Sequence, residues 1–254
     1  MLTWTGHAPW SALGTLDWVL LCLFFIWSGF VRSGLGFGGA ALTLPFLLLV
    51  VGDPLVFLPP ICFHLLFFSL LTVATRLDFV NWRYLGRLIS LIVLPVAAGL
   101  IGLLNLPGVF MSAFVYAITL LYGSMYLLGR EFVSGGRIMD GVCLLGGGYA
   151  AGASLIGAPL MVAYSAPRLP SEQLRDTLFV LWIVMVLAKL ATFVSAGVNL
   201  QLPFMLAMFP LVALGHVAGL RLHRAIVRGG AARFRRVIGG GLVLVSLFGL
   251  FALL

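Results

Sequence analysis

Long uncharged runs of apolar residues dominate the chain, and they predict membrane-spanning helices. A bilayer core of about 30 Å needs about 20 apolar residues in helical conformation. The runs that meet or approach this length are Leu55–Thr75, Leu88–Leu106, Val109–Gly129, Leu202–Leu220 and Val237–Leu254. A sixth run, Thr177–Ala188, continues past the single charge of Lys189 to Ala196. The breaks between them are short and rich in Asn, Asp, Pro and Gly, which predicts tight turns between antiparallel neighbours.

Two other apolar segments are interrupted by glycine. Leu16–Val51 would measure roughly 54 Å as one helix, which is too long for a single crossing, and it contains the glycine-rich stretch Arg32–Ala40. Val142–Ala166 contains the second glycine-rich stretch, Gly146–Pro159. We expect each segment to be a helix that breaks in its middle and returns as a hairpin. A single kinked span is the alternative that the sequence leaves open.

The order of these segments repeats. Each half of a single membrane domain (1–254) holds one glycine-broken segment and then three uninterrupted helices, which divides the chain into repeats 1–132 and 138–254. Arginines at 76–87, 130–137 and 221–236 mark the loops on the cytoplasmic side. Because three full helices per half is an odd number, the second half is inverted. The predicted fold is an all-α integral membrane protein of two inverted pseudo-repeats with about eight transmembrane segments, typical of secondary transporters.

Composition excludes a soluble or disordered chain. Of 254 residues, 62% are hydrophobic and 9% charged, whereas an ordinary globular chain is about 25% charged. The net charge of +8 is explained by arginines in loops, which favours membrane topology over nucleic-acid binding. Cys22, Cys62 and Cys143 are far apart in apolar runs and offer neither a disulfide framework nor a metal site. We therefore predict no metal and no organic cofactor.

The glycine-broken segments are the first candidates for a substrate site. Irregular backbone at membrane depth is tolerated where protein or a watery cavity satisfies its polar groups, and glycine lets backbone approach a ligand closely. The candidate substrate-binding residues from these segments are Gly34, Gly36, Gly38, Gly39, Gly152, Ser154 and Gly157. Close helix packing is the alternative use of glycine in membrane helices.

Ionisable residues inside the apolar runs are the second pointer, because they are costly in a membrane and are usually functional. All are basic: Arg32, His64, Lys189 and His216. No carboxylate lies in the middle of a run, so the predicted site binds an anion. Arg32 and Lys189 would attract its charge, and His64 and His216 would line the site or couple proton movement. The alternatives are an Arg32 that reaches the interface, histidines satisfied in the core and a structural Lys189.

Several short motifs resemble those of a known family. They are Gly34–Gly39 with Pro45, Arg76–Arg83, and Gly157–Pro159 with Leu174–Leu178. In their order and spacing they resemble the TauE/SafE sulfite exporter family. That resemblance implies a membrane permease of two related halves that moves sulfur-containing anions such as sulfite, sulfoacetate and related organosulfonates.

The sequence thus predicts a non-enzymatic, multi-pass transporter of small anions in the inner cell membrane, with the lipid bilayer and the anion as partners. It leaves open the coupling ion, the direction of transport and whether the chain forms a homo-oligomer. One rival function is an intramembrane hydrolase with Ser154 as nucleophile and His216 as base. Another is a channel-forming or structural membrane subunit.

Overall fold

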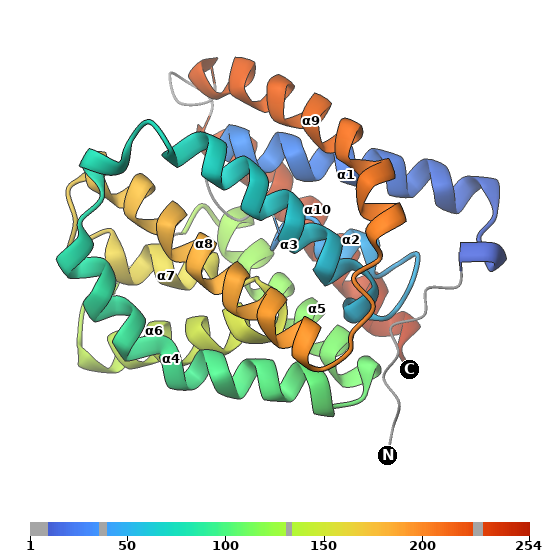
Figure 1. Ribbon diagram of the computed structural model, residues 1–254, viewed down its shortest axis with the longest axis horizontal. Coiled ribbons are helices and arrows are strands. Elements are labelled where there is room, and N and C mark those ends of the chain that lie inside the picture. The colour runs from blue at the N-terminus through green and yellow to red at the C-terminus, as the bar shows by residue number, and fades with distance from the viewer. Residues whose placement is uncertain (1–9, 36–39, 131–133, 226–230) are drawn as a thin grey trace.

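The computed structural model describes residues 10–35, 40–130, 134–225 and 231–254. Within these ranges the chain is helical and contains no strand (Figure 1). Short 3-10 helices lie at Trp10–Ala12 and Leu77–Phe79. The α-helices are α1 (Thr15–Leu35), α2 (Leu44–Leu47), α3 (Pro54–Val73), α4 (Trp82–Asn105), α5 (Gly108–Leu127), α6 (Arg137–Ser154), α7 (Ala158–Ser165), α8 (Ser171–Ser195), α9 (Leu202–Ala225) and α10 (Ala231–Ala252).

Among the described residues, six helices are long and apolar enough to cross a membrane: α1, α3, α4, α5, α8 and α9. All of these except α1 were expected as uninterrupted spans. The sixth expected span lies in α10, whose apolar part, Arg236–Ala252, is shorter. α1 was expected as the first arm of a glycine-broken segment, and it ends at Leu35, inside the stretch Arg32–Ala40 where the sequence suggested a break.

Local sequence explains where the central helices begin. The side chain of Asp53 accepts a hydrogen bond from Leu55 N at 2.9 Å and caps α3, whose first residue is Pro54. Burial raises the pKa of the Asp53 carboxyl, and the Leu55 N–H opposes that effect. Asn81 caps α4 in the same way through Tyr84 N at 3.0 Å.

The second glycine-rich segment folds back on itself. α6 ends at Ser154, and Leu155 adopts a left-handed conformation with φ of 61°, which turns the chain into α7. At the other end of the hairpin, Ser134 N donates to Ala163 O at 3.3 Å, and Arg168 pairs with Asp140 at 2.7 Å. Both ends of the segment therefore lie on one side, and this segment is a hairpin and not one kinked span.

The first glycine-rich segment also returns along its own first helix. Trp27 Nε1 donates to Leu42 O at 2.9 Å, and the rings of Phe24 and Phe46 lie 5.4 Å apart. The earlier residue of α1, Phe24, thus contacts the later residue of the second arm, and the later residue of α1, Trp27, contacts the earlier one. The two arms are therefore antiparallel. The starts of α1 and α3 lie on the same side of the molecule, at the right of Figure 1.

Four helix pairs build the body of the molecule: α1 with α9, α4 with α6, α5 with α10, and α3 with α8. Glycine permits the closest of these crossings. A Cβ atom at Gly29 of α1 would overlap the carbonyl oxygen of Val212 on α9. The long helices are therefore held by backbone-to-backbone proximity between halves of the chain.

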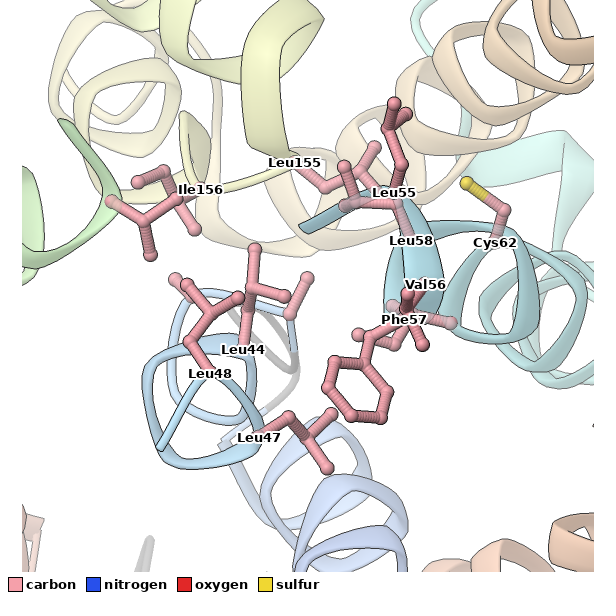
Figure 2. Close-up of a cluster of buried hydrophobic side chains, with 14 of the residues drawn as sticks. Leu44, Leu47, Leu48, Leu55, Val56, Phe57, Leu58, Cys62, Leu155 and Ile156 are labelled. Carbon is pink, nitrogen blue, oxygen red and sulfur yellow. The ribbon is translucent and has the colours of Figure 1, made fainter. Parts of the chain in front are cut away.

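The two glycine-rich segments meet in one apolar cluster against the start of α3. Leu44 and Leu48 come from the second arm of the first segment, Leu155 and Ile156 from the turn of the second, and Leu55 from α3 (Figure 2). All five side chains are buried. The contact between the two segments is thus filled with aliphatic side chains.

Candidate functional site

Arg32 points into the protein from the last turn of α1. Its side chain is only 4% exposed, and Nη1 donates to the carbonyl oxygen of His64 on α3 at 2.7 Å. Its guanidinium carbon lies 5.5 Å from the ring centroid of Phe68. Nε is buried and has no hydrogen-bond partner among the described residues. This geometry does not fit an arginine that reaches the membrane interface.

His64 lies on α3 and is almost fully buried. Its Nε2 is 3.0 Å from the carbonyl oxygen of Met205 on α9. Because a carbonyl can only accept, Nε2 must carry the proton in the neutral ring. Nδ1 then holds a lone pair, and within the described ranges it has no partner. Only one of the two ring nitrogens of this buried histidine therefore has a hydrogen-bond partner among the described residues.

His216 on α9 contacts the same helix as Arg32. Its Nδ1 hydrogen bonds to Ser33 Oγ, and the Ser33 hydroxyl also lies 3.0 Å from Gly29 O. Since the hydroxyl has one hydrogen, which goes to that carbonyl, His216 Nδ1 is the donor to Ser33. The His216 ring centroid lies 4.6 Å from that of Phe68, which places it beside the aromatic ring that Arg32 also faces.

Arg32, Ser33, His64, Phe68 and His216 together form what we call the Arg32 cluster, built by α1, α3 and α9. The ion pairs of the described residues are Arg76–Asp176 and Arg168–Asp140, so none reaches this cluster. A buried cation without a counter-ion is costly in a membrane. The cluster is therefore electrostatically suited to receive an anion.

Lys189 is also buried, at 1% exposure, but it belongs to a different place. Nζ donates to Gly152 O in the last turn of α6 and lies 5.8 Å from the Phe193 ring centroid. α3 packs against α8, which carries Lys189, and against α9, which carries His216. α8 and α9 are not among the helix pairs that pack extensively against each other, so α3 separates Lys189 from the Arg32 cluster.

The two buried cations nevertheless have a common role in the architecture. Arg32 links α1 to α3 through the His64 carbonyl, and Lys189 links α8 to α6 through the Gly152 carbonyl. In each half, one cation ties the first helix of the glycine-rich segment to the long helix that follows the segment. Lys189 also meets the carbonyl end of α6, where the helix dipole favours positive charge.

The glycines of the second hairpin are packed against backbone. A Cβ atom at Gly152 would overlap Val96 O of α4, and one at Gly157 would overlap Gly147 O of α6. Close packing thus accounts for both glycines. Gly34 is described as part of α1. The remaining candidates, Gly36, Gly38 and Gly39, lie outside the described residues.

Ser154 and His216 are not brought together. Ser154 Oγ donates to Ala150 O at 3.3 Å within α6, whereas His216 bonds to Ser33 on α1. These contacts leave no nucleophile–base pair between the two residues. In the described ranges, no group of three or more His, Cys, Asp or Glu is arranged to hold a metal ion.

One polar cluster was not anticipated as a site. Arg76, after α3, pairs with Asp176 of α8 at 2.8 Å, and the Asp176 side chain is fully buried. Asn81 donates to Gln173 Oε1 at 3.0 Å, and its backbone N–H donates to Thr177 Oγ1 at 3.0 Å. All of these residues except Gln173 come from two of the motifs that suggested the family. Their proximity joins the α3–α4 connection to the start of α8 at the arginine-rich end of the helices.

Comparison with known proteins agrees with this picture. The profile described as "Sulfite exporter TauE/SafE" matches residues 20–249, which is nearly the whole chain. No curated protein and no solved structure matches the chain. The family consists of membrane transporters, which agrees with the membrane-length helices and with the absence of a Ser154–His216 pair among the described contacts. The chain therefore belongs to the TauE/SafE sulfite exporter family and is a multi-pass membrane protein of transport function.

Proposed function

We propose that the chain is a secondary transporter of small sulfur-containing anions, such as sulfite or sulfoacetate, in the inner cell membrane. The observation that carries the proposal is the buried Arg32, which has no counter-ion among the described residues and a buried Nε–H without a partner there. An oxyanion beside Nε would satisfy this donor and neutralise the charge. The family membership supports the same class of cargo.

His64 is the better placed of the two histidines for coupling transport to protons. Its Nδ1 lone pair is buried and unpartnered among the described residues, whereas His216 Nδ1 is engaged by Ser33. The charged group next to His64 is Arg32 from α1, whose Nη1 bonds to the His64 carbonyl oxygen. A proton on Nδ1 would add positive charge next to Arg32, so protonation and anion binding would favour each other.

Lys189 is proposed as a second cationic contact for the anion. The burial of Lys189 and the chemistry of its side chain support this role. The ammonium has three donors, and the hydrogen bond to Gly152 O uses one of them. Because Lys189 lies across α3 from the Arg32 cluster, an anion would meet the two cations in succession. Contact of the anion with Gly34, Gly152, Ser154 or Gly157 stays a prediction, and for Gly152 and Gly157 packing against backbone already explains the residue type.

The inverted repeat is part of the proposal, with repeats at residues 1–132 and 138–254. Each half has the same order of one long, one short and three long helices. In this order α1 corresponds to α6, α3 to α8, α4 to α9 and α5 to α10. If each helix is replaced by its counterpart, the pair α1–α9 becomes α6–α4, and the pairs α3–α8 and α5–α10 stay the same. All four pairs are in contact. Both glycine-rich segments run back along their own first helix. An inverted repeat of this kind supports alternating access, in which a site between the two halves opens first to one side of the membrane and then to the other.

Uptake of radiolabelled sulfite by liposomes that contain only this protein tests the function. We expect saturable uptake that competing sulfoacetate inhibits, and we expect Arg32→Gln to weaken apparent affinity by roughly ten- to hundredfold, the value of a hydrogen bond to a charged group. Arg87→Gln, an exposed arginine on α4, is the matched control. Flux that stays linear with sulfite concentration would favour a channel, and unchanged affinity in Arg32→Gln would refute the Arg32 site.

A further inference from the structure

An apolar cavity of about 340 Å³ is lined by none of the residues of the Arg32 cluster. It is formed by α1, α2 and α10, and its lining includes Leu23, Phe24, Trp27, Phe46, Val237 and Gly241. Leu23 and Val237 are 54% and 71% exposed, so the cavity borders the outer surface of the bundle. In a protein that spans a bilayer, this surface contacts lipid.

The lining offers no free polar group to a ligand. Trp27 carries the one polar side-chain atom among the residues just named, and that atom already donates to Leu42 O at 2.9 Å. A polar solute would therefore lose its hydrogen bonds to water without replacement. A hydrocarbon chain gains contacts there at no such cost, and the bilayer supplies hydrocarbon chains at high concentration.

Positive charge lies next to this cavity. Arg236 is exposed and directly precedes Val237 of the lining, and its guanidinium lies beside Gly129 at the end of α5. The sequence has no acidic residue after Asp176. Basic groups at the cytoplasmic face of helix bundles attract anionic headgroups.

We propose that this cavity is a binding site for an anionic phospholipid, with one acyl chain between α1, α2 and α10 and the phosphate at Arg236. The chain would fill the space between the first hairpin and α10, and would hold this hairpin against the body of the protein. The proposal depends on the membrane location of the chain and is independent of the identity of the transported anion.

Native mass spectrometry of protein taken from vesicles of equal phosphatidylglycerol and phosphatidylethanolamine tests the site. We expect the unmodified protein to retain a phosphatidylglycerol molecule. Gly241→Leu should lose it, because a side chain at this position meets no atom within 4 Å and would grow into the cavity. Gly86→Leu on α4, where a Cβ also meets nothing, should retain it.

Arg236→Gln tests the headgroup. It should retain phospholipid but reduce the preference for phosphatidylglycerol by about fivefold, the effect of one arginine near an anionic surface. Equal retention of lipid by Gly241→Leu and the unmodified protein would overturn the acyl-chain site. Equal retention of the two phospholipids by the unmodified protein would overturn the charge assignment.

A second measurement does not depend on the folding of Gly241→Leu. Brominated phosphatidylglycerol should quench tryptophan fluorescence more strongly than brominated phosphatidylethanolamine, and Trp27→Phe should remove this difference, because Trp27 lines the cavity. If the difference persists in Trp27→Phe, the lipid lies elsewhere and the proposal is wrong.

Discussion

Replacement of Gly152 by alanine separates a packing role from a direct contact with substrate. In an open helix position, Gly→Ala stabilises by about 0.5–1 kcal/mol, because glycine loses more backbone freedom on folding. At Gly152 the added Cβ would overlap Val96 O, a backbone atom that cannot rotate away. Overpacking of this kind costs about 1–3 kcal/mol. We expect Gly152→Ala to be destabilising by about 1–2 kcal/mol overall, since the steric cost exceeds the gain.

Gly141→Ala is the matched control, because it lies on the same helix and a Cβ there meets nothing within 4 Å. Thermal unfolding of both variants in the same detergent, followed by intrinsic fluorescence, gives the comparison, and sulfite uptake is measured in parallel. Gly152→Ala should melt at lower temperature than the unmodified protein, and Gly141→Ala at the same or higher temperature. If Gly152→Ala melts normally and yet loses uptake, Gly152 contacts the substrate and the packing argument fails.

Two further predictions concern polar groups. Asp176→Asn should lower the free energy of unfolding by about 1–2 kcal/mol. This is less than the cost of breaking a fully buried ion pair, because the partner Arg76 is 45% exposed and is hydrated again when the pair is lost. Asp78→Asn, at an exposed position in the α3–α4 connection, is the control and should melt like the unmodified protein. If Asp176→Asn also melts at that temperature, this estimate is wrong. His64→Gln should flatten the pH dependence of sulfite uptake, whereas His216→Gln should preserve it. Uptake assays at several external pH values check this, and the opposite result would assign proton coupling to His216.

Much of the fold could be predicted because the bilayer restricts the choices of the chain. Backbone groups in hydrocarbon must bond within their own segment, so a long apolar run has to be helical. Asp53-Pro54 and Asn105-Leu106-Pro107-Gly108 then mark where helices begin and end. The first glycine-rich segment was harder, since Gly34 is tolerated inside α1 when neighbouring helices pack against it.

The residues of the candidate site could be predicted from the sequence, but the contacts that each of them makes could not. A charge or an imidazole inside an apolar run is visible in sequence, and Arg32, His64 and His216 were found in this way and lie together. Their partners were not visible, because His64 bonds to the backbone carbonyl of Met205 and any residue type supplies one. Lys189 and His64 were expected to face one site; Lys189 bonds to Gly152 of α6 and His64 to Met205 of α9, and a site shared by the two stays a prediction.

Sequence by itself determined that this protein lies in a membrane, that it is helical and that the ionisable residues in the middle of its apolar runs are basic, because each depends on residue type and on distance along the chain. Tertiary structure alone decided which of these groups are neighbours. Gly152 shows the difference, since glycine is compatible with both a substrate contact and a helix crossing, and only the position of Val96 on another helix distinguishes them. Arg32 shows it again, because the lack of a counter-ion among the described residues is a property of the helices that surround it. Such contacts join residues far apart in the chain, and no local pattern encodes them.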